Sequence, residues 1–389
     1  MARAITVLVG TTKGAFLLRS AGDGQEWRLT GPFCDGWSIN HVVGDPQTGT
    51  IWAAGGGDWQ GAGVWRSEDG GESWTLSLLA NGKMDEWLTN DPEFAAYSGK
   101  QPSPPAPFTG QISALWSLGQ AGDTLLAGAK PASLFASRDQ GETWQRVDAL
   151  TDHPTAPDWQ PGGAGLILHC IVADPQDPQK LWVGISAAGV FASEDGGVSW
   201  EQRNRLSNAA ADHAAHAHPG TGACGHEVGH CVHNMVRAPE AGQNGNDLFY
   251  QQNHHGVFRS ADGGRNWQDI TAGLPSNFGF PIAVHSRDPN TIWVLPLNGD
   301  MAGRYPPNAS AAVWRSRNGG DSWEALQNGL PDRNCFFTVL RQAMAVDRAT
   351  PAGIYFGTNS GSVFASSDEG DHWSEIAQHL PTVLSVEVM

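Results

Sequence analysis

One short pattern recurs along the whole chain and constrains its fold more than any other feature. The pattern is Ser-x-Asp-x-Gly-x-x-Trp, with Asn replacing Asp in one copy, and we call each copy a Ser–Trp turn. The Asp of such a sequence accepts hydrogen bonds from the amides of a tight turn, the Gly supplies a positive φ, and the Trp anchors the next strand. Self-similarity at a fixed period, here about 58 residues on average, is typical of repeat architectures. The copies are residues 67–74, 137–144, 193–200, 260–267, 316–323 and 366–373, and residues 20–27 form a degenerate copy without the acid.

Short apolar strands precede the Ser–Trp turns and complete a unit of four strands. Residues 189–193 lead directly into one turn, residues 181–184 form the strand before them, and residues 169–174 form a still earlier strand that ends in Asp-Pro. The strand that the Trp begins is the fourth. Four antiparallel strands repeated radially predict a β-propeller, which packs its sheets against one another and leaves few exposed edges.

The two ends of the chain predict how the ring closes. The first unit begins with a second-position strand at residues 5–10, so it lacks an innermost strand. Residues 382–388 form a strand after the last turn that no other unit uses. The sequence therefore predicts an all-β fold: a seven-bladed β-propeller of four-stranded antiparallel blades, with the C-terminal strand completing the N-terminal blade. We expect residues 1–389 to form this propeller as a single domain.

Composition restricts the partners. The chain has 23 Lys and Arg against 40 Asp and Glu, a formal net charge of −17, which argues against nucleic acid or an anionic membrane as partner. A small-molecule substrate is expected instead. No stretch approaches the ~20 apolar residues of a membrane span, and the start of the chain does not read as a signal peptide, so we expect a soluble, cytoplasmic protein. Five scattered cysteines do not suggest a disulfide framework, although a pair between Cys224 and Cys231 stays open.

The Ser–Trp turns resemble those of the Asp-box, or BNR-repeat, propellers. That group includes sialidases, xyloglucan-cleaving glycoside hydrolases, sortilin-type receptors and photosystem-assembly factors. The whole chain is similar to bacterial sialidase-like, glycosyl-hydrolase BNR-repeat proteins, and the segments that carry this likeness besides the turns are residues 7–14, 152–154, 278–280 and 283–285. The turns lie on hairpins away from the face where propellers usually bind ligands, so they indicate a fold and not a chemistry. A sialidase resemblance also implies an arginine triad and a tyrosine nucleophile, whereas the first blade lacks an Arg-Ile-Pro-type segment and the chain has only four Tyr.

Histidines gather where the propeller is expected to bind its ligand. The loops that join an outer strand to the next inner strand open at the same end as those joining second and third strands. Six of the 14 His lie within residues 213–233. Imidazoles at this density suit Zn, Cu, Fe or Ni, so the sequence predicts a divalent transition metal, with Zn first. The alternative is a set of polar loop histidines bonded to neighbouring blades. The predicted ligands are His169, His226, His230, His233, His254 and His285.

Residues 226–230 read His-Glu-Val-Gly-His, which matches the H-E-x-x-H motif of metalloproteases. That motif needs a helix, and the surrounding glycines and following strand disfavour one. Glu227 is nevertheless a candidate general base. His255 and Arg341 complete the predicted catalytic residues; an arginine at the start of an inner strand suits an anionic ligand, and a buried pair with an acid is the alternative.

Three functional classes remain. The first, which the histidines favour, is a metal-dependent hydrolase in which a His-ligated ion activates water to attack an ester or phosphoester. The second is a sialidase-like glycoside hydrolase that uses paired carboxylates from loops of different blades, as the resemblance implies. The third is a binding or assembly propeller without chemistry.

Overall fold

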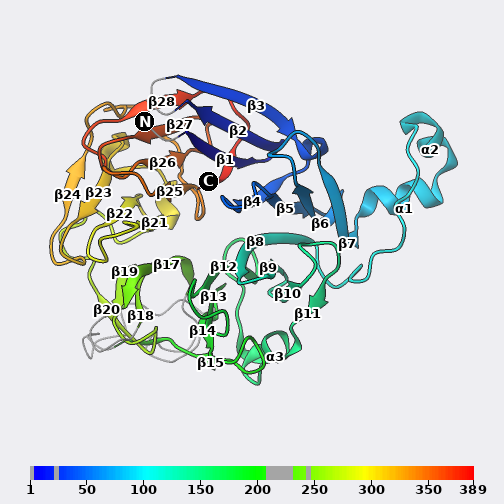
Figure 1. The fold of residues 1–389 in the computed structure, drawn as a ribbon, viewed down its shortest axis with the longest axis horizontal. Helices are drawn as coiled ribbons and strands as arrows, with labels where there is room; N and C mark the ends of the chain where they lie inside the picture. Colours follow the sequence, from blue (N-terminus) through cyan, green and yellow to red (C-terminus); the bar gives the residue numbers. More distant parts are fainter. Residues whose placement is uncertain (1–3, 22–25, 207–230, 242–246) are drawn as a thin grey trace.

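The structure is a computed structural model that describes residues 4–21, 26–206, 231–241 and 247–389. These residues form seven β-sheets arranged radially around one axis, which confirms the predicted seven-bladed β-propeller (Figure 1). No helix among the described residues is long and apolar enough to cross a membrane.

The first four blades are built in chain order around the ring. Their strands are, for blade 1, β29 (Val383–Val388), β1 (Ile5–Thr11), β2 (Gly14–Ser20) and β3 (Trp27–Phe33); for blade 2, β4 (Ile39–Gly44), β5 (Ile51–Gly57), β6 (Gly61–Ser67) and β7 (Thr75–Asn81); for blade 3, β8 (Ala114–Ala121), β9 (Thr124–Lys130), β10 (Leu134–Ser137) and β11 (Gln145–Arg146); and for blade 4, β12 (Ile167–Ala173), β13 (Leu181–Ser186), β14 (Gly189–Ser193) and β15 (Glu201–Gln202).

The last three blades continue the ring, and one of them has an additional strand. Blade 5 contains β17 (Val232–Ala241), β18 (Asp247–Asn253), β19 (Gly256–Ser260) and β20 (Asn266–Asp269), with β16 (Arg205–Leu206) pairing in parallel with β20; blade 6 contains β21 (Gly279–Val284), β22 (Ile292–Pro296), β23 (Val313–Ser316) and β24 (Glu324–Leu326); and blade 7 contains β25 (Met344–Val346), β26 (Ile354–Gly357), β27 (Val363–Ser366) and β28 (Ser374–Ala377).

The C-terminal strand closes the ring as predicted. Strand β29 pairs antiparallel with β1, so that Val9 lies opposite Val386 and Val7 opposite Val388. The chain termini therefore share one sheet, and the innermost strand of blade 1 comes from the far end of the sequence (Figure 1).

The Ser–Trp turns close the outer hairpins by the same hydrogen bonds in all six full copies. In blade 4, Ser193 Oγ donates to Asp195 Oδ1 (2.8 Å) and accepts from the amide of Gly197 (2.8 Å). Asp195 Oδ1 also accepts from the amide of Ser199 (2.9 Å). Gly197 has φ +90°, a conformation that a side chain would disfavour. The turn is thus specified locally, by residues at most six positions apart.

The same turns also join neighbouring blades. The carbonyl of the fourth turn residue accepts a hydrogen bond from the preceding blade at five junctions within the described residues. Trp52 Nε1 donates to the Gln140 carbonyl (2.8 Å), and Trp182 Nε1 and Arg203 Nη1 both donate to that of Gly263. The remaining contacts of this kind are Arg19 to Gly70, Arg259 to Gly319, and Trp293 together with Arg315 to Glu369.

The hydrophobic core lies between the sheets. Trp182, Phe249 and Trp267, for example, are buried together where blade 4 faces blade 5, and the Trp182 and Phe249 rings lie 4.7 Å apart. Inner strands are mostly buried: β21 is buried at all but its last residue, and β12 is buried over residues 167–170 and half-buried beyond them. Because both faces of each sheet are buried, the strand sequences are continuous apolar runs and do not alternate strictly between apolar and polar residues.

Helices occur only as inserts between strands in the described part of the chain. The β7–β8 connection carries α1 (Lys83–Asn90) and α2 (Pro92–Ser98), which project from the rim of the ring (Figure 1). Asp91 caps α2 by accepting from the amides of Glu93 and Phe94. The other helical segments are α3 (Asp148–Thr151) and the 3₁₀ turns η1 (Cys34–Gly36), η2 (Ala156–Asp158), η5 (Asp300–Ala302) and η6 (Pro307–Ala309).

The inter-blade bond predicts a cost for removing the indole donor. Trp52→Phe keeps an aromatic ring in the core but leaves the Gln140 carbonyl without this partner, so we expect the free energy of unfolding to fall by about 1 to 2 kcal/mol. Urea denaturation followed by far-UV circular dichroism measures this change. Trp59→Phe is the matched control, because the Trp59 side chain is exposed. Equal stability of the two variants would contradict the proposed role of the bond.

The turn aspartates predict acid sensitivity. Hydrogen bonds from Ser137 and Thr143 lower the pKa of Asp139 from 3.8 to about 2, and those from Ser199 and Ser193 lower that of Asp195 to about 2. Such a carboxylate has a lower pKa in the folded than in the unfolded protein. It stabilises the fold at pH values above its unfolded-state pKa, and this stabilisation is lost as the pH falls through its folded-state pKa. We therefore expect stability to decline between about pH 4 and pH 2.

Asp139→Asn tests this pH dependence. Asn318 occupies the same turn position in blade 6 and makes the same contacts to Ser316 and Ser322, so Asn is compatible with the turn. The variant should show a weaker decline in the urea midpoint from pH 4 to pH 2, whereas Asp123→Asn, in the exposed β8–β9 turn, should behave as the wild type. An unchanged pH profile for Asp139→Asn would exclude this carboxylate as a contributor.

Candidate functional site

The inner strands give the propeller two distinct ends. Because neighbouring strands of a blade are antiparallel, the inner strands begin at the same end at which second and third strands are joined; we call it the loop end. The inner strands finish at the opposite end, where the Ser–Trp turns lie, and we call it the turn end. Strand β17 thus begins beside the β18–β19 turn.

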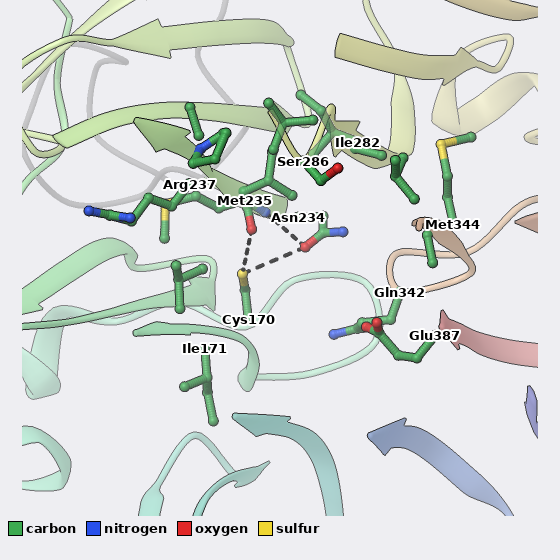
Figure 2. A pocket seen from close by; sticks show the side chains of 18 of the residues that line it. Cys170, Ile171, Asn234, Met235, Arg237, Ile282, Ser286, Gln342, Met344 and Glu387 are labelled. Carbon is green, nitrogen blue, oxygen red and sulfur yellow. Dashed lines mark hydrogen bonds between the residues drawn. The ribbon is translucent and has the colours of Figure 1, made fainter. Parts of the chain in front are cut away.

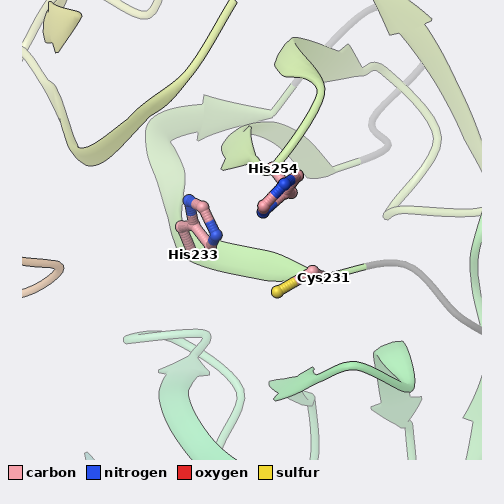
Figure 3. A group of neighbouring side chains, drawn as sticks. All are labelled: Cys231, His233 and His254. Carbon is pink, nitrogen blue, oxygen red and sulfur yellow. The ribbon is translucent and has the colours of Figure 1, made fainter. Parts of the chain in front are cut away.

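Two predicted histidines meet a cysteine at the loop end. Cys231 immediately precedes β17, His233 is the second residue of that strand, and His254 lies in the β18–β19 turn (Figure 3). The Cys231 thiol and the two imidazoles offer ligand atoms that all lie within 4.8 Å of one another. The His254 amide donates to the Cys231 carbonyl (3.0 Å), which fixes the turn against the strand. Cys231 and His233 are buried, whereas His254 is half-buried.

His233 is held in one tautomer. Its Nδ1 lies 2.6 Å from the Gly279 carbonyl at the start of β21, and since a carbonyl only accepts, Nδ1 carries the proton. Nε2 therefore keeps its lone pair. The rings of Phe278 and Phe280 flank the imidazole at centroid distances of 5.4 and 4.7 Å. Burial, followed by the charge of Arg341, lowers the pKa of His233 well below 6.5, so the ring is neutral near pH 7.

Cys231 is a buried, free thiol with polar neighbours. Its Sγ lies 3.0 Å from Ser186 Oγ on β13 of blade 4. Burial raises the pKa of the Cys231 thiol, while the Ser186 contact and the charge of Arg341 act in the opposite direction. Asp300 and Arg304, from the connection between β22 and β23, are also close enough for their charges to act on this thiol.

Arg341 lies over the same region without an acidic partner. Its guanidinium carbon is 4.8 Å from the centroid of the Phe280 ring, and its buried Nε has no hydrogen-bond partner among the described residues. The Asn234 side chain donates to the Arg341 carbonyl (2.8 Å), which ties this segment to β17. No ion pair of Arg341 occurs within the described ranges, so the structure gives no support to the expected alternative of a buried pair with an acid.

His169 is near this group but does not join it. The side chain is completely buried on β12, and neither ring nitrogen makes a hydrogen bond within the described part of the chain. Burial and the charge of Arg341 lower its pKa well below 6.5, although the Val232 backbone partly opposes this. Gln342 donates across the axis to the His169 carbonyl, so blades 4 and 7 are connected at this level.

The other predicted site residues lie elsewhere or outside the described residues. His285 follows β21, about 20 Å along the strand from Gly279, at the turn end. There its Nδ1 accepts from the amides of Arg287 and Asp288, and it stacks on Trp293. It cannot share an ion with His233 because the two lie at opposite ends of the inner strands. His255 adjoins the cluster, with its ring centroid 5.0 Å from that of His254. His226, Glu227 and His230 lie outside the described residues.

Sequence reasoning missed Cys231 as a ligand candidate. It considered this residue only as a disulfide partner of Cys224, which lies outside the described residues. A signal was present, because Cys231 and His233 are only two residues apart and both residue types are ligands of transition metals.

A cavity of about 740 Å³ occupies the turn end of the axis. Figure 2 shows Cys170, Asn234, Gln342 and Glu387 along its wall, and Cys170 Sγ donates to the Met235 carbonyl (3.3 Å). His169 also lines this cavity, so it lies between the two ends of the axis.

Comparison with known proteins gives distant relatives. No family model matches the chain. An oligoxyloglucan-reducing end-specific xyloglucanase of Emericella nidulans is 26% identical over 224 residues, which cover 52% of this chain and 25% of that protein. This chain thus spans about a quarter of the curated relative that it matches.

Solved structures support the fold. A GH74 enzyme from Niastella koreensis aligns with a TM-score of 0.61 at 15% identity, over 96% of this chain and 52% of that one. A putative 6-phosphogluconolactonase from Bacteroides uniformis aligns with a TM-score of 0.56 at 12% identity, over 99% of both chains. At such identities the likeness concerns the fold alone: the chain is a β-propeller of a kind that glycoside hydrolases also use.

Proposed function

We propose that this chain is a glycoside hydrolase that acts on a β-linked glucan at the loop end of the propeller. The observation that carries the proposal is the sequence similarity to the xyloglucanase, which extends over 224 residues. The fold likeness to a GH74 enzyme over 96% of this chain is consistent with it. The shared sequence covers a quarter of the xyloglucanase, so xyloglucan is the first substrate to test and not an assigned one.

The chemistry requires two carboxyl groups beside the scissile bond. One protonates the leaving oxygen, and the other acts as a nucleophile at a separation of about 5 to 5.5 Å or activates water at about 6.5 to 9.5 Å. Burial and the charge of Asp300 both raise the pKa of the nearby Cys231 thiol. The Asp300 side chain is 34% exposed and forms an ion pair with Arg304. We propose Asp300 as one member of this pair.

Arg341 has a role in binding under this proposal. Its guanidinium lies over the Phe280 ring and forms no ion pair within the described ranges, so its N–H groups suit donation to a sugar hydroxyl or to the ring oxygen of the substrate. We also propose that the chain is a single-domain member of the Asp-box propellers, a group that includes sialidase-like proteins. The six Ser–Trp turns, which share the same hydrogen bonds, support this proposal.

A second candidate is a metal-dependent hydrolase of esters or phosphoesters. The observation that favours it is the cluster of Cys231, His233 and His254, with His255 and Glu227 as candidate proton-transfer groups. An ion there would lower the pKa of a bound water and so supply the nucleophile. The two candidates differ in their sensitivity to chelators and in their substrates.

The test is a substrate screen on the purified full chain. We expect release of reducing ends from xyloglucan oligosaccharides that persists in the presence of a chelator. Asp300→Asn should lower kcat/KM by about 10² to 10⁴, the range for loss of a proton-transferring group. Asp332→Asn is the control, since that carboxylate is 84% exposed in a neighbouring loop and should leave the rate unchanged.

Two results would contradict the glycoside hydrolase. The first is hydrolysis of p-nitrophenyl phosphate or acetate that a chelator abolishes, with no release of reducing sugar, which favours the metal-dependent candidate. The second is no turnover of either substrate class, which favours a propeller that binds without chemistry.

A further inference from the structure

We propose that Cys231, His233 and His254 form a three-ligand site for Zn²⁺ or a similar transition-metal ion, with a fourth position open toward the loop end. The site replaces the all-histidine set expected from the sequence with one thiolate and two imidazoles. It does not depend on the glycoside hydrolase proposal, because the ion would bind whether or not the chain cleaves glycans.

The spacing of the ligand atoms is near that of a tetrahedral zinc centre. Zn–S and Zn–N bonds of about 2.3 and 2.0 to 2.1 Å place tetrahedral ligands about 3.3 to 3.6 Å apart. The three ligand atoms all lie within 4.8 Å of one another, so rotamer adjustments of about 1 Å would complete the site. Figure 3 shows the thiol and both imidazoles converging from β17 and the β18–β19 turn.

The backbone holds the ligands in place before an ion arrives. His233 is the second residue of β17 and Cys231 immediately precedes that strand, at a point where the pairing with β18 has an irregularity between Val232 and Asn234. The third ligand is tied to the first, because the His254 amide donates to the Cys231 carbonyl (3.0 Å). All three therefore belong to one β-hairpin of blade 5, so binding requires little rearrangement of the chain.

His233 is oriented as a metal ligand. Metal-binding histidines usually donate their second ring N–H to a carbonyl or carboxylate, which fixes the ring and leaves the other nitrogen free. The bond from His233 Nδ1 to the Gly279 carbonyl (2.6 Å) is of this kind and leaves Nε2 for the ion.

The donor set selects the kind of ion. One thiolate and two imidazoles suit Zn²⁺ or Cu and exclude Mg²⁺ and Ca²⁺, which prefer oxygen. Binding converts the Cys231 thiol to a thiolate and releases its proton to solvent. The guanidinium groups of Arg304 and Arg341 also act on this thiol. Asp300 pairs with Arg304 and opposes its charge, so the Arg341 guanidinium, which forms no ion pair in the described part of the chain, is the group that suits an open position taken by water, hydroxide or an anionic group.

The experiment titrates Co²⁺ into full-length protein that carries no His-tag and has been stripped with a chelator. Tetrahedral Co²⁺ gives strong visible absorption, and a thiolate ligand adds a charge-transfer band in the near ultraviolet. We expect one equivalent of Co²⁺ to produce both signals and Zn²⁺ to displace it. Cys231→Ser should lose the charge-transfer band and bind Co²⁺ at least about 10-fold more weakly.

Matched controls separate ligation from folding. Cys34→Ser removes another buried free thiol, and His285→Asn removes the predicted ligand at the turn end; both should leave the spectrum unchanged. His254→Asn is the second test variant, since this residue is half-buried and its loss disturbs the core least. It should retain the charge-transfer band but weaken Co²⁺ binding about 10-fold. Far-UV circular dichroism of the stripped proteins verifies the fold.

Two outcomes would overturn the site. Stripped wild-type protein that binds neither Co²⁺ nor Zn²⁺ at micromolar concentration would exclude it. A charge-transfer band that persists in folded Cys231→Ser would place the thiolate ligand elsewhere. Neither outcome bears on glycan cleavage, which is measured separately by release of reducing sugar.

Discussion

The interaction on which the propeller depends is the hydrogen bond from one blade to the carbonyl of the fourth residue in the next Ser–Trp turn. Indole donors such as Trp52 and Trp182 and guanidinium donors such as Arg259 reach this carbonyl at successive junctions. Each bond contributes only about 1 kcal/mol, but it directs a large buried side chain to a fixed point on the neighbouring sheet. A turn that is specified locally thus also sets the position of one blade against the next.

This repeated alignment brings residues from distant parts of the sequence together near the axis. Side chains on one inner strand donate hydrogen bonds to backbone carbonyls of the next blade's inner strand. His233 donates to the Gly279 carbonyl and Cys170 to the Met235 carbonyl. Contacts across the axis, from Gln342 to the His169 carbonyl and from Asn234 to the Arg341 carbonyl, connect blades that are not neighbours. The loop end therefore combines imidazoles, a thiol and a guanidinium in a largely buried setting.

The fold does not by itself choose a chemistry. Propellers of similar architecture occur in a GH74 enzyme and in a putative 6-phosphogluconolactonase, so activity has to be argued from the loop end. There a half-buried carboxylate, Asp300, acts on the thiol of the group Cys231, His233 and His254, whose side chains are of metal-ligating type. The proposal of glycan cleavage depends on Asp300 and on sequence similarity, whereas the proposed metal site depends on Cys231, His233 and His254. The two proposals are therefore independent.

The sequence alone determined the blades, their number and the closing strand, because each Ser–Trp turn is built from residues within one short segment and its period counts the units. It also predicted that His233 and His254 would lie at the same end of the propeller. Only the tertiary structure decided which side chains meet: Cys231 joins the two histidines because a strand and a neighbouring turn converge, and His285 does not because it follows its strand at the other end. Such distances depend on the twist and packing of whole sheets, which no local pattern encodes.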